Sequence, residues 1–258
     1  MELTLKGQRA LVTGGGTGIG RAIAGTLAQA GANVVIVGRR EPPLEEVATA
    51  IAAEGGQCAA RPVDVRDAGA VNALFEELVR EAGAFHVLVN NAGAGGPNAC
   101  SDDGPDRWDE IVRTNLDGTF FCSRAALKDM PNGGRIINIS SVLGRFGVPG
   151  YTAYCASKTG VIGFTRALAL EVAPRKINVN AICPGWVETE MAREGMELLS
   201  QVQGTSYEEA RKMALSIVPI QRIVEPAEVA DLVHFMASPA AGAMTGQAVA
   251  LCGGATMV

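Results

Sequence analysis

The sequence is poor in histidine and in paired cysteines. Its 258 residues include two histidines and six cysteines, and no two cysteines have the Cys-x-x-Cys spacing. Zinc sites and disulfide frameworks both depend on such clusters or pairs. We therefore expect neither a metal centre nor a disulfide scaffold, and we interpret the cysteines as reduced thiols.

Long hydrophobic runs and an excess of positive charge are also absent. No apolar stretch reaches the roughly 18–20 residues that span a bilayer. Residues 1–7 lack the apolar core of a signal peptide, and the net charge is −5. An acidic chain is a poor partner for nucleic acid or anionic membranes. We expect a cytoplasmic protein with no nucleic-acid or membrane partner.

Aromatic residues make up only 5% of the chain, whereas hydrophobic residues make up 48% and glycine is abundant. That composition suits close packing of helices on a sheet. Strand-like and helix-like segments alternate without a linker or an internal repeat. A single α/β domain over residues 1–258 is predicted.

Short apolar runs predict seven strands, at residues 9–13, 33–37, 57–63, 86–89, 135–141, 177–183 and 248–251. Helical periodicity predicts helices at residues 21–30, 44–54, 71–82, 106–130, 153–172 and 226–236. A further helical excursion at about residues 188–222 carries several methionines. It suits a lid over an apolar substrate, although ordinary helix packing gives the same pattern.

A glycine-rich turn follows the first predicted strand. Residues 14–20 have the sequence Gly-Gly-Gly-Thr-Gly-Ile-Gly and lead into a helix. Backbone N–H groups in such a turn can approach a pyrophosphate at the helix N-terminus, whereas a tight turn alone would bind nothing. The strand and helix on either side favour nucleotide binding. The candidate contacts are Gly14, Gly16, Thr17, Gly18, Ile19 and Gly20.

The second strand ends in Gly38, Arg39 and Arg40. A site for NAD usually has an acidic residue about 20 residues after the glycine turn, to bond the ribose 2′-hydroxyl. Gly38 cannot do so, whereas a guanidinium can hold a 2′-phosphate. The alternative is a basic pair on a solvated turn. We predict NADP(H) as the cofactor.

Further candidates follow the next two strands. Asp64, with Val65 beside it, can accept a hydrogen bond from an adenine amino group or cap the following helix. The fourth strand leads into Asn91, Ala92 and Gly93. His86, at the edge of that strand, is expected to be structural.

Tyr154 and Lys158 stand four residues apart in the predicted helix 153–172. Their side chains therefore leave the same helix face. An adjacent ammonium favours the phenolate and moves the tyrosine toward the range in which proton transfer is efficient. A Tyr and a Lys on an ordinary exposed face would show the same spacing.

Two polar residues have a functional and a structural interpretation. Ser141 ends the fifth strand, at the edge where open α/β sheets bind ligands. Asn115 lies inside a predicted helix, where asparagine is unfavourable. It is either tolerated there or marks a local break that frees a carbonyl to hold a water molecule.

The sixth strand ends at Pro184 and Gly185, and Val187 and Thr189 follow. Pro-Gly ends a strand sharply. Thr189 can cap a following helix or bond a cofactor amide.

Together these pieces resemble the short-chain dehydrogenase/reductase family over essentially the whole chain. The matching pieces are Thr13-Gly14-x-x-x-Gly18-Ile19-Gly20, Asn90-Asn91-Ala92-Gly93, Asn115, Ser141, Tyr154-x-x-x-Lys158 and Pro184-Gly185. Ser141 lies thirteen residues before Tyr154, the family's usual separation, and is preferred over Ser140. The resemblance implies a doubly wound Rossmann-type fold with a parallel sheet of strand order 3-2-1-4-5-6-7. It also implies a homotetramer.

Within the family, the C-terminal half is most similar to 3-oxoacyl reductases and to the ketoreductases of aromatic polyketide pathways. The similar stretches are residues 187–192 (Val-Glu-Thr-Glu-Met-Ala) and 252–254 (Cys-Gly-Gly). Residues 94–97 (Ala-Gly-Gly-Pro) depart from the Pro-Gly-Gly that those ketoreductases often carry. Cys252 replaces an Asp of many relatives, and we expect a buried thiol.

The expected chemistry is reversible hydride transfer between NADPH and a ketone carbon. Tyr154 exchanges the proton, Lys158 lowers the pKa of that tyrosine and holds the nicotinamide ribose, and Ser141 donates to the oxyanion. Asn115 would anchor a water molecule that links Lys158 to solvent. Residues 94–100, 142–151 and 186–213 are expected to line the pocket. They suit a bulky apolar ketone, free or carried on an acyl carrier protein or CoA.

Two alternatives remain at this stage. One is a dehydrogenase that oxidises a secondary alcohol or a sugar-like hydroxyl. The other is a non-catalytic NADP(H)-binding protein on the same fold.

Overall fold

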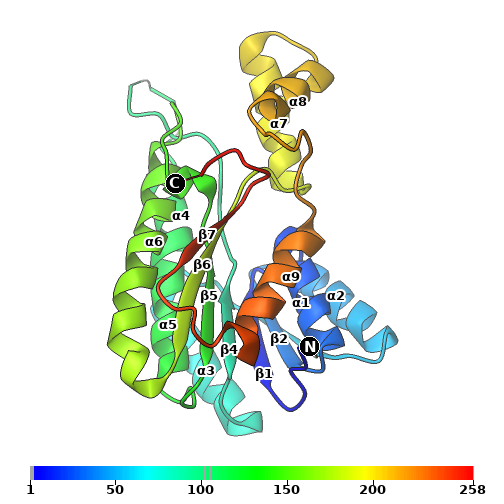
Figure 1. Cartoon of the computed structure of the whole chain (residues 1–258), viewed down its shortest axis with the longest axis vertical. Coiled ribbons are helices and arrows are strands. Elements are labelled where there is room, and N and C mark those ends of the chain that lie inside the picture. Colours follow the sequence, from blue (N-terminus) through cyan, green and yellow to red (C-terminus); the bar gives the residue numbers. More distant parts are fainter. Residues whose placement is uncertain (1–2, 102, 105, 258) are drawn as a thin grey trace.

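In the computed structural model, residues 3–101, 103–104 and 106–257 are described (Figure 1). Met1 and Glu2, part of the N-terminal segment considered above, lie outside this range. Within it, parallel strands form one sheet in the order β3-β2-β1-β4-β5-β6-β7, which confirms the predicted fold class. The strands are β1 (Arg9–Thr13), β2 (Asn33–Gly38), β3 (Gln57–Pro62), β4 (Val87–Asn90), β5 (Arg135–Ile139), β6 (Asn178–Pro184) and β7 (Ala248–Leu251).

Helices cover both faces of the sheet, with α1, α2 and α9 on one face and α3, α5 and α6 on the other (Figure 1). The helices are α1 (Gly18–Gln29), α2 (Glu41–Ala53), α3 (Ala68–Ala82), α4 (Trp108–Val112), α5 (Gly118–Leu127), α6 (Thr152–Val172), α7 (Glu190–Gln203), α8 (Tyr207–Ser216) and α9 (Pro226–Ala237). The strand order reverses between β1 and β4. In open α/β sheets ligands bind outside the carboxyl ends of the strands at this point.

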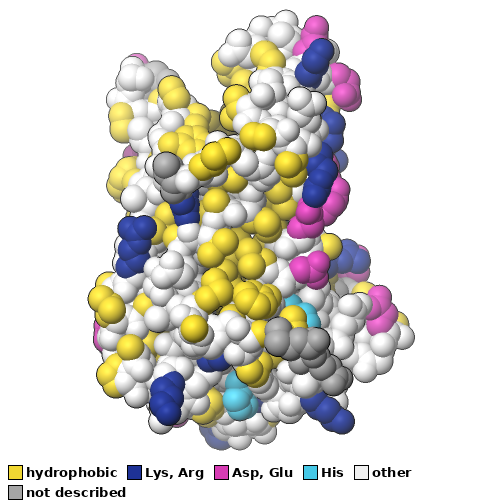
Figure 2. Space-filling view, viewed as in Figure 1, with side chains coloured by type: hydrophobic (Ala, Val, Ile, Leu, Met, Phe, Trp, Pro, Cys, Tyr) yellow, Lys and Arg dark blue, Asp and Glu magenta, His cyan; other side chains and the backbone are white. Residues whose placement is uncertain are grey.

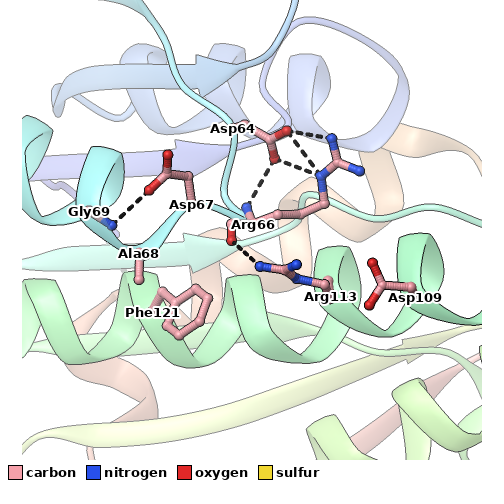
Figure 3. A pocket seen from close by; sticks show the side chains of 8 residues that line it. All are labelled: Asp64, Arg66, Asp67, Ala68, Gly69, Asp109, Arg113 and Phe121. Atoms are coloured by element: carbon pink, nitrogen blue, oxygen red, sulfur yellow. Dashed lines mark hydrogen bonds and ion pairs between the residues drawn. The ribbon is translucent and has the colours of Figure 1, made fainter.

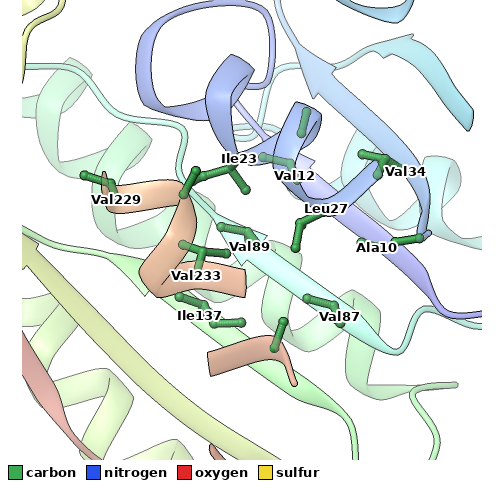
Figure 4. Close-up of a cluster of buried hydrophobic side chains, with 14 of the residues drawn as sticks. Ala10, Val12, Ile23, Leu27, Val34, Val87, Val89, Ile137, Val229 and Val233 are labelled. Carbon is green, nitrogen blue, oxygen red and sulfur yellow. The ribbon is translucent and has the colours of Figure 1, made fainter. Parts of the chain in front are cut away.

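Two hydrophobic layers hold the helices to the sheet, because successive strand side chains point to opposite faces. Val12 of β1 packs with Ile23 of α1 and Val233 of α9 on one face (Figure 4). Leu11 faces the other way and lies in the layer that contains Phe75 of α3. Fully burying each such side chain contributes about 1.5–3 kcal/mol. These layers fix the strand ends that carry the polar residues.

Several element boundaries differ from the prediction by a few residues, and two of these differences adjoin the site. Helix α2 begins at Glu41 rather than Leu44, with Pro42 and Pro43 in its first turn, where a missing N–H group leaves no broken helical bond. Strand β5 ends at Ile139, so that Ser141 lies beyond the strand rather than within it.

The long helix predicted at residues 106–130 is interrupted. Helix α4 is followed by a π-helical turn (Arg113–Asp117) and then by α5. Asn115 lies in this turn, so the local break is the correct one of its two interpretations. Its carbonyl oxygen accepts a hydrogen bond from Thr119 Oγ1 at 2.7 Å. Single π-turns of this kind are frequent at functional sites.

Helices α7 and α8 form the predicted excursion and stand out beyond the carboxyl edge of the sheet (Figure 1). A small cluster that includes Met196, Ala214 and Ile223 packs within it. None of the helices in the described part of the chain combines the length and apolarity of a bilayer span. All six cysteines are free thiols.

Candidate active site

The glycine-rich turn between β1 and α1 is shaped by close backbone contacts. Gly14 has a φ of +65°, and a Cβ atom there would lie 2.9 Å from the Cα of Ala92. Gly18 has a φ of +51°, and its Cβ would lie 3.2 Å from the Cγ2 of Thr189. Only glycine can combine a positive φ with such a close approach to a neighbouring residue without strain. The other predicted contacts in this turn are Gly16, Thr17, Ile19 and Gly20.

Asn91 braces this turn from the end of β4. Its Nδ2 donates to the carbonyl oxygens of Thr13 (2.9 Å) and Gly14 (3.2 Å). The Thr13 hydroxyl accepts from the backbone N–H groups of Asn91 and Ala92, each at 2.9 Å. The Asn91 side chain therefore supports the turn by bonding the carbonyl oxygens of Thr13 and Gly14.

A cleft of about 130 Å³ opens beside the turn. Its lining residues are Gly14, Gly16, Thr17, Gly38, Arg39, Arg40, Pro43, Leu44, Val63, Asp64, Val65, Ala92, Gly93 and Thr114. Arg39 and Arg40 are exposed at the rim. Neither guanidinium forms a hydrogen bond or ion pair with another described residue.

These residues fit a dinucleotide that carries an additional phosphate. Bare glycine backbone forms the floor of the cleft. The first turn of α1 has no acidic residue, and the N-cap Thr17 makes no side-chain capping bond. The positive end of the helix is thus available to a pyrophosphate, and the two rim arginines to a 2′-phosphate.

Asp64 faces the cleft and does not cap the following helix. Asp67 is the N-cap of α3 and accepts from the backbone N–H groups of Gly69 (2.8 Å) and Ala70 (3.0 Å), so the capping interpretation of Asp64 is wrong (Figure 3). Asp64 pairs with Arg66, whose Nη2 lies 2.6 Å from Oδ2. Hydrogen bonds from Arg66 hold the pKa of the Asp64 carboxyl below its ordinary value.

Tyr154 and Lys158 leave α6 on the same face, and Lys158 Nζ lies 5.7 Å from the centre of the tyrosine ring. Ser141 follows β5, accepts from Leu143 N at 3.1 Å and bonds the phenol. Ser140 points elsewhere and donates its hydroxyl to the Lys158 carbonyl oxygen at 2.8 Å. The structure thus places Ser141, and not Ser140, beside the phenol.

The pKa of Tyr154 runs against the expectation from the sequence. Burial raises this pKa above its ordinary value of 10, and the bond with Ser141 opposes the rise. Lys158 is only 4% exposed, and burial lowers its pKa from 10.5 to about 8. Its Nζ donates to the Ile139 carbonyl oxygen at 2.8 Å. The expected lowering of the tyrosine pKa by Lys158 is therefore wrong for this state, because the amine is desolvated and bonded to a strand end.

Asn115 joins the loop after β4 to helix α6. Its Oδ1 accepts from Ala94 N at 2.8 Å, and its Nδ2 donates to the Ala94 carbonyl oxygen and to Ser157 Oγ, both at 3.0 Å. A Cβ atom at Gly93 would lie 3.4 Å from Asn115 Oδ1 and 3.5 Å from Lys158 Nζ. The bare backbone of Gly93 leaves room beside the lysine amine.

The segment after β6 connects the nucleotide cleft to the lid. Pro184 ends the strand, and a Cβ atom at Gly185 would lie 2.9 Å from that of Cys252, the expected buried thiol, which is 6% exposed. Val187 is buried. Thr189 is the N-cap of α7 and accepts from a first-turn N–H group at 3.3 Å. Because Thr189 also lies against Gly18, the base of the lid touches the glycine turn.

The three segments predicted to line the substrate pocket meet around the phenol. Asn98 and Tyr151 pair as an isolated bridge. A Cβ atom at Gly95 would lie 3.0 Å from the sulfur of Met191 and 3.6 Å from Cε2 of Tyr154. Figure 2 shows hydrophobic side chains in the hollow between the lid and the opposite loops. The segments are residues 94–100, 142–151 and 186–213.

Sequence reasoning did not identify three side chains of this region. Thr114 lines the cleft, Ser157 accepts from Asn115, and Arg66 bonds Asp64. Ser157 had a signal, since it is a polar residue within the Tyr154-x-x-x-Lys158 motif. Arg66 had none, because an arginine two residues after an aspartate is common on any exposed turn.

Comparisons with known proteins agree with this geometry. A family profile described as enoyl-(acyl carrier protein) reductase matches residues 14–256. A Streptomyces coelicolor protein named as a ketoacyl reductase is 42% identical over 249 residues, which are 95% of each chain. The 3-oxoacyl-[acyl-carrier-protein] reductase FabG of Vibrio harveyi is 38% identical over 99% of this chain and 100% of its own.

Among solved structures, a single-residue variant of actinorhodin polyketide ketoreductase with NADPH superposes with a TM-score of 0.91. It is 41% identical over 96% of this chain and 97% of its own. The resemblance drawn from the motifs is thereby confirmed. The chain belongs to the short-chain dehydrogenase/reductase family.

Proposed function

We propose that this chain reduces a ketone to a secondary alcohol with NADPH. The observation that carries the proposal is the convergence of Tyr154, Ser141 and Lys158 at the carboxyl edge of the sheet, next to the glycine-lined cleft. A proton donor and an oxyanion donor beside a nucleotide site are what carbonyl reduction requires.

Each polar residue has a part in this reaction. Bound NADPH supplies the hydride. Tyr154 gives the carbonyl oxygen its proton, and its raised pKa keeps the phenol protonated at neutral pH. Ser141 donates to the developing oxyanion. Lys158 would hold the nicotinamide ribose and resupply the proton, and Asn115 would hold the connecting water molecule.

The remaining predicted contacts bind the cofactor. The glycine turn receives the pyrophosphate, and Arg39 and Arg40 receive the 2′-phosphate. Asp64 and Val65 face the adenine. Asn91, Ala92 and Gly93, with Pro184, Gly185, Val187 and Thr189, bound the nicotinamide half.

The substrate is a bulky or 3-oxoacyl ketone of the polyketide type, delivered free or on an acyl carrier protein or CoA. The hydrophobic side chains in the hollow between the lid and the opposite loops support this proposal, as do the names of the relatives. The working unit is a homotetramer in the cytoplasm, where six free thiols stay reduced.

NADPH oxidation with two substrates in parallel tests the proposal. One is a rigid bicyclic ketone such as a decalone, and the other is an acetoacetyl thioester, with Tyr154→Phe as the blank. Faster turnover of the decalone supports a polyketide-type reductase, whereas faster turnover of the thioester moves the assignment to acyl-chain metabolism. Tight NADPH binding with no turnover of either would contradict ketone reduction of this class.

The oxidative alternative is separated from ketone reduction by the cofactor. Alcohol oxidation and ketone reduction use the same tyrosine in opposite directions, so a strong preference for NADPH over NADH is the observation that would argue against the oxidative alternative.

A further inference from the structure

One arginine surrounds the carboxylate of Asp64. The backbone N–H of Arg66 donates to Oδ1 at 3.0 Å, its Nε lies 3.0 Å from both oxygens, and its Nη2 donates to Oδ2 at 2.6 Å. An ionised carboxylate offers about four acceptor positions and no donor. The three N–H groups of Arg66 make four contacts with the two oxygens, because Nε is shared between them, and they hold the carboxylate in one orientation.

Arg66 is itself anchored. Arg113 Nη2 donates to the Arg66 carbonyl oxygen at 3.3 Å (Figure 3). Arg113 belongs to the π-helical turn, which also supplies Thr114 to the nucleotide cleft. The orientation of the Arg66 backbone is thus tied to an element that lines the cleft.

The pair is open to solvent on its outer side. Arg66 and Asp64 line a groove of about 440 Å³ that starts at the N-terminus of α3 and runs along the π-turn and α5 (Figure 3). Their side chains are 34% and 32% exposed. An ion pair with this exposure adds little to the stability of a fold. Asp64 also lines the nucleotide cleft, whereas Arg66 does not.

We propose that Arg66 is a positioning residue that makes Asp64 select an amino group at the 6-position of the cofactor purine. The inference rests on the proposed NADP(H) site. Held ionised and in one orientation at the cleft, the carboxylate can accept a hydrogen bond there but cannot donate one. Adenine offers a 6-amino donor, whereas hypoxanthine offers a 6-oxo acceptor that this carboxylate repels.

The test is equilibrium binding, followed by nicotinamide fluorescence, of NADPH and of its 6-oxo analogue, reduced nicotinamide hypoxanthine dinucleotide phosphate. Because hydrogen bonds to charged groups are strong, we expect the wild-type chain to bind NADPH roughly ten- to a hundredfold more tightly than the 6-oxo analogue. In Arg66→Leu we expect the preference to fall to about threefold or less, mainly through weaker NADPH binding, because the freed carboxylate rotates and regains solvent. Arg66→Lys keeps the charge without the planar fork, so its preference should be intermediate.

Arg61→Leu is the matched control. Arg61 lies on β3, is 35% exposed and pairs with Glu81 at 3.4 Å, away from the cleft. Its removal should leave the preference unchanged, and thermal melting of all variants verifies folding. A wild-type preference that persists in Arg66→Leu, or equal weakening of both dinucleotides, would overturn the inference and leave the proposed function intact. Failure of both dinucleotides to bind the wild-type chain would overturn both.

Discussion

The nucleotide side and the lid are built in different ways. Around the glycine turn, buried strands end in residues that are locked by hydrogen bonds, such as Thr13 and Asn91. The lid packs around a small cluster and leaves large apolar side chains exposed. These include Met191, Val202, Met213, Ile217 and Ile220, which are 41–72% exposed.

This difference suggests a division of roles: the rigid sheet and its helices carry out the reaction, and the lid selects the ketone. A rigid body can hold a cofactor and a proton donor in one geometry, and pre-organised groups are what stabilise a transition state. A weakly packed lid can adapt to a large ketone without disturbing that geometry. Substitutions in the sheet and the helices packed on it, here called the body, should therefore change the rate and the cofactor preference. Substitutions in the lid should change the ketone preference.

The largest expected effect is at Tyr154. Tyr154→Phe should lower kcat by about 10²–10⁴-fold, the usual contribution of a positioned general acid. The NADPH dissociation constant should stay within about threefold, because the ring remains and only the proton donor is lost. Stopped-flow turnover together with fluorescence titration checks both quantities. Near-wild-type turnover in this variant would show that Tyr154 is not the proton donor.

The next effect concerns the cofactor. Arg39→Asp should weaken NADPH binding by roughly 2–5 kcal/mol, by analogy with other close charge pairs, and should favour NADH. The kcat/KM ratio for NADPH over NADH measures this change at fixed ketone. Arg21→Asp is a suitable control, since Arg21 is an exposed residue of α1 that pairs with Glu46. An unchanged ratio in Arg39→Asp would mean that the 2′-phosphate is bound elsewhere.

The pH dependence of reduction should follow Lys158. Its lowered pKa of about 8 means that the ammonium is lost as the pH rises through 8. We expect kcat/KM for ketone reduction to be flat from pH 6 to 7.5 and then to fall about tenfold per pH unit above the break. Tyr154 adds no break in this range, because its pKa is raised. A profile that stays flat to pH 9.5 would contradict this account.

The smallest effect is expected in the lid. Met191 is 46% exposed, and its sulfur lies against Gly95, which also adjoins the phenol ring of Tyr154. Met191→Ala should widen this passage and raise the kcat/KM ratio of decalone to acetoacetyl thioester by about three- to tenfold. Met213→Ala, an exposed methionine of α8, serves as the control. A larger change in NADPH affinity than in ketone preference would show that lid and body are not separable.

The sequence predicted those features that depend on local spacing. The four-residue spacing of Tyr154 and Lys158 places both on one helix face, and a glycine turn between a strand and a helix needs no distant partner. The π-turn at Asn115 was left open, because it forms only when α4 and α5 pack against α6. The pKa of Tyr154 could not be predicted, since it depends on how tertiary packing desolvates the phenol and directs the amine of Lys158 to Ile139.

The central claim is that cofactor binding and ketone choice reside in separate parts of the molecule. The most direct measurement is of both quantities in Arg39→Asp and Met191→Ala side by side: the NADPH dissociation constant and the decalone-to-thioester ratio of kcat/KM. Our account predicts that Arg39→Asp changes only the first and Met191→Ala only the second. If either substitution changes both to a similar extent, the two parts act as one and the account is contradicted.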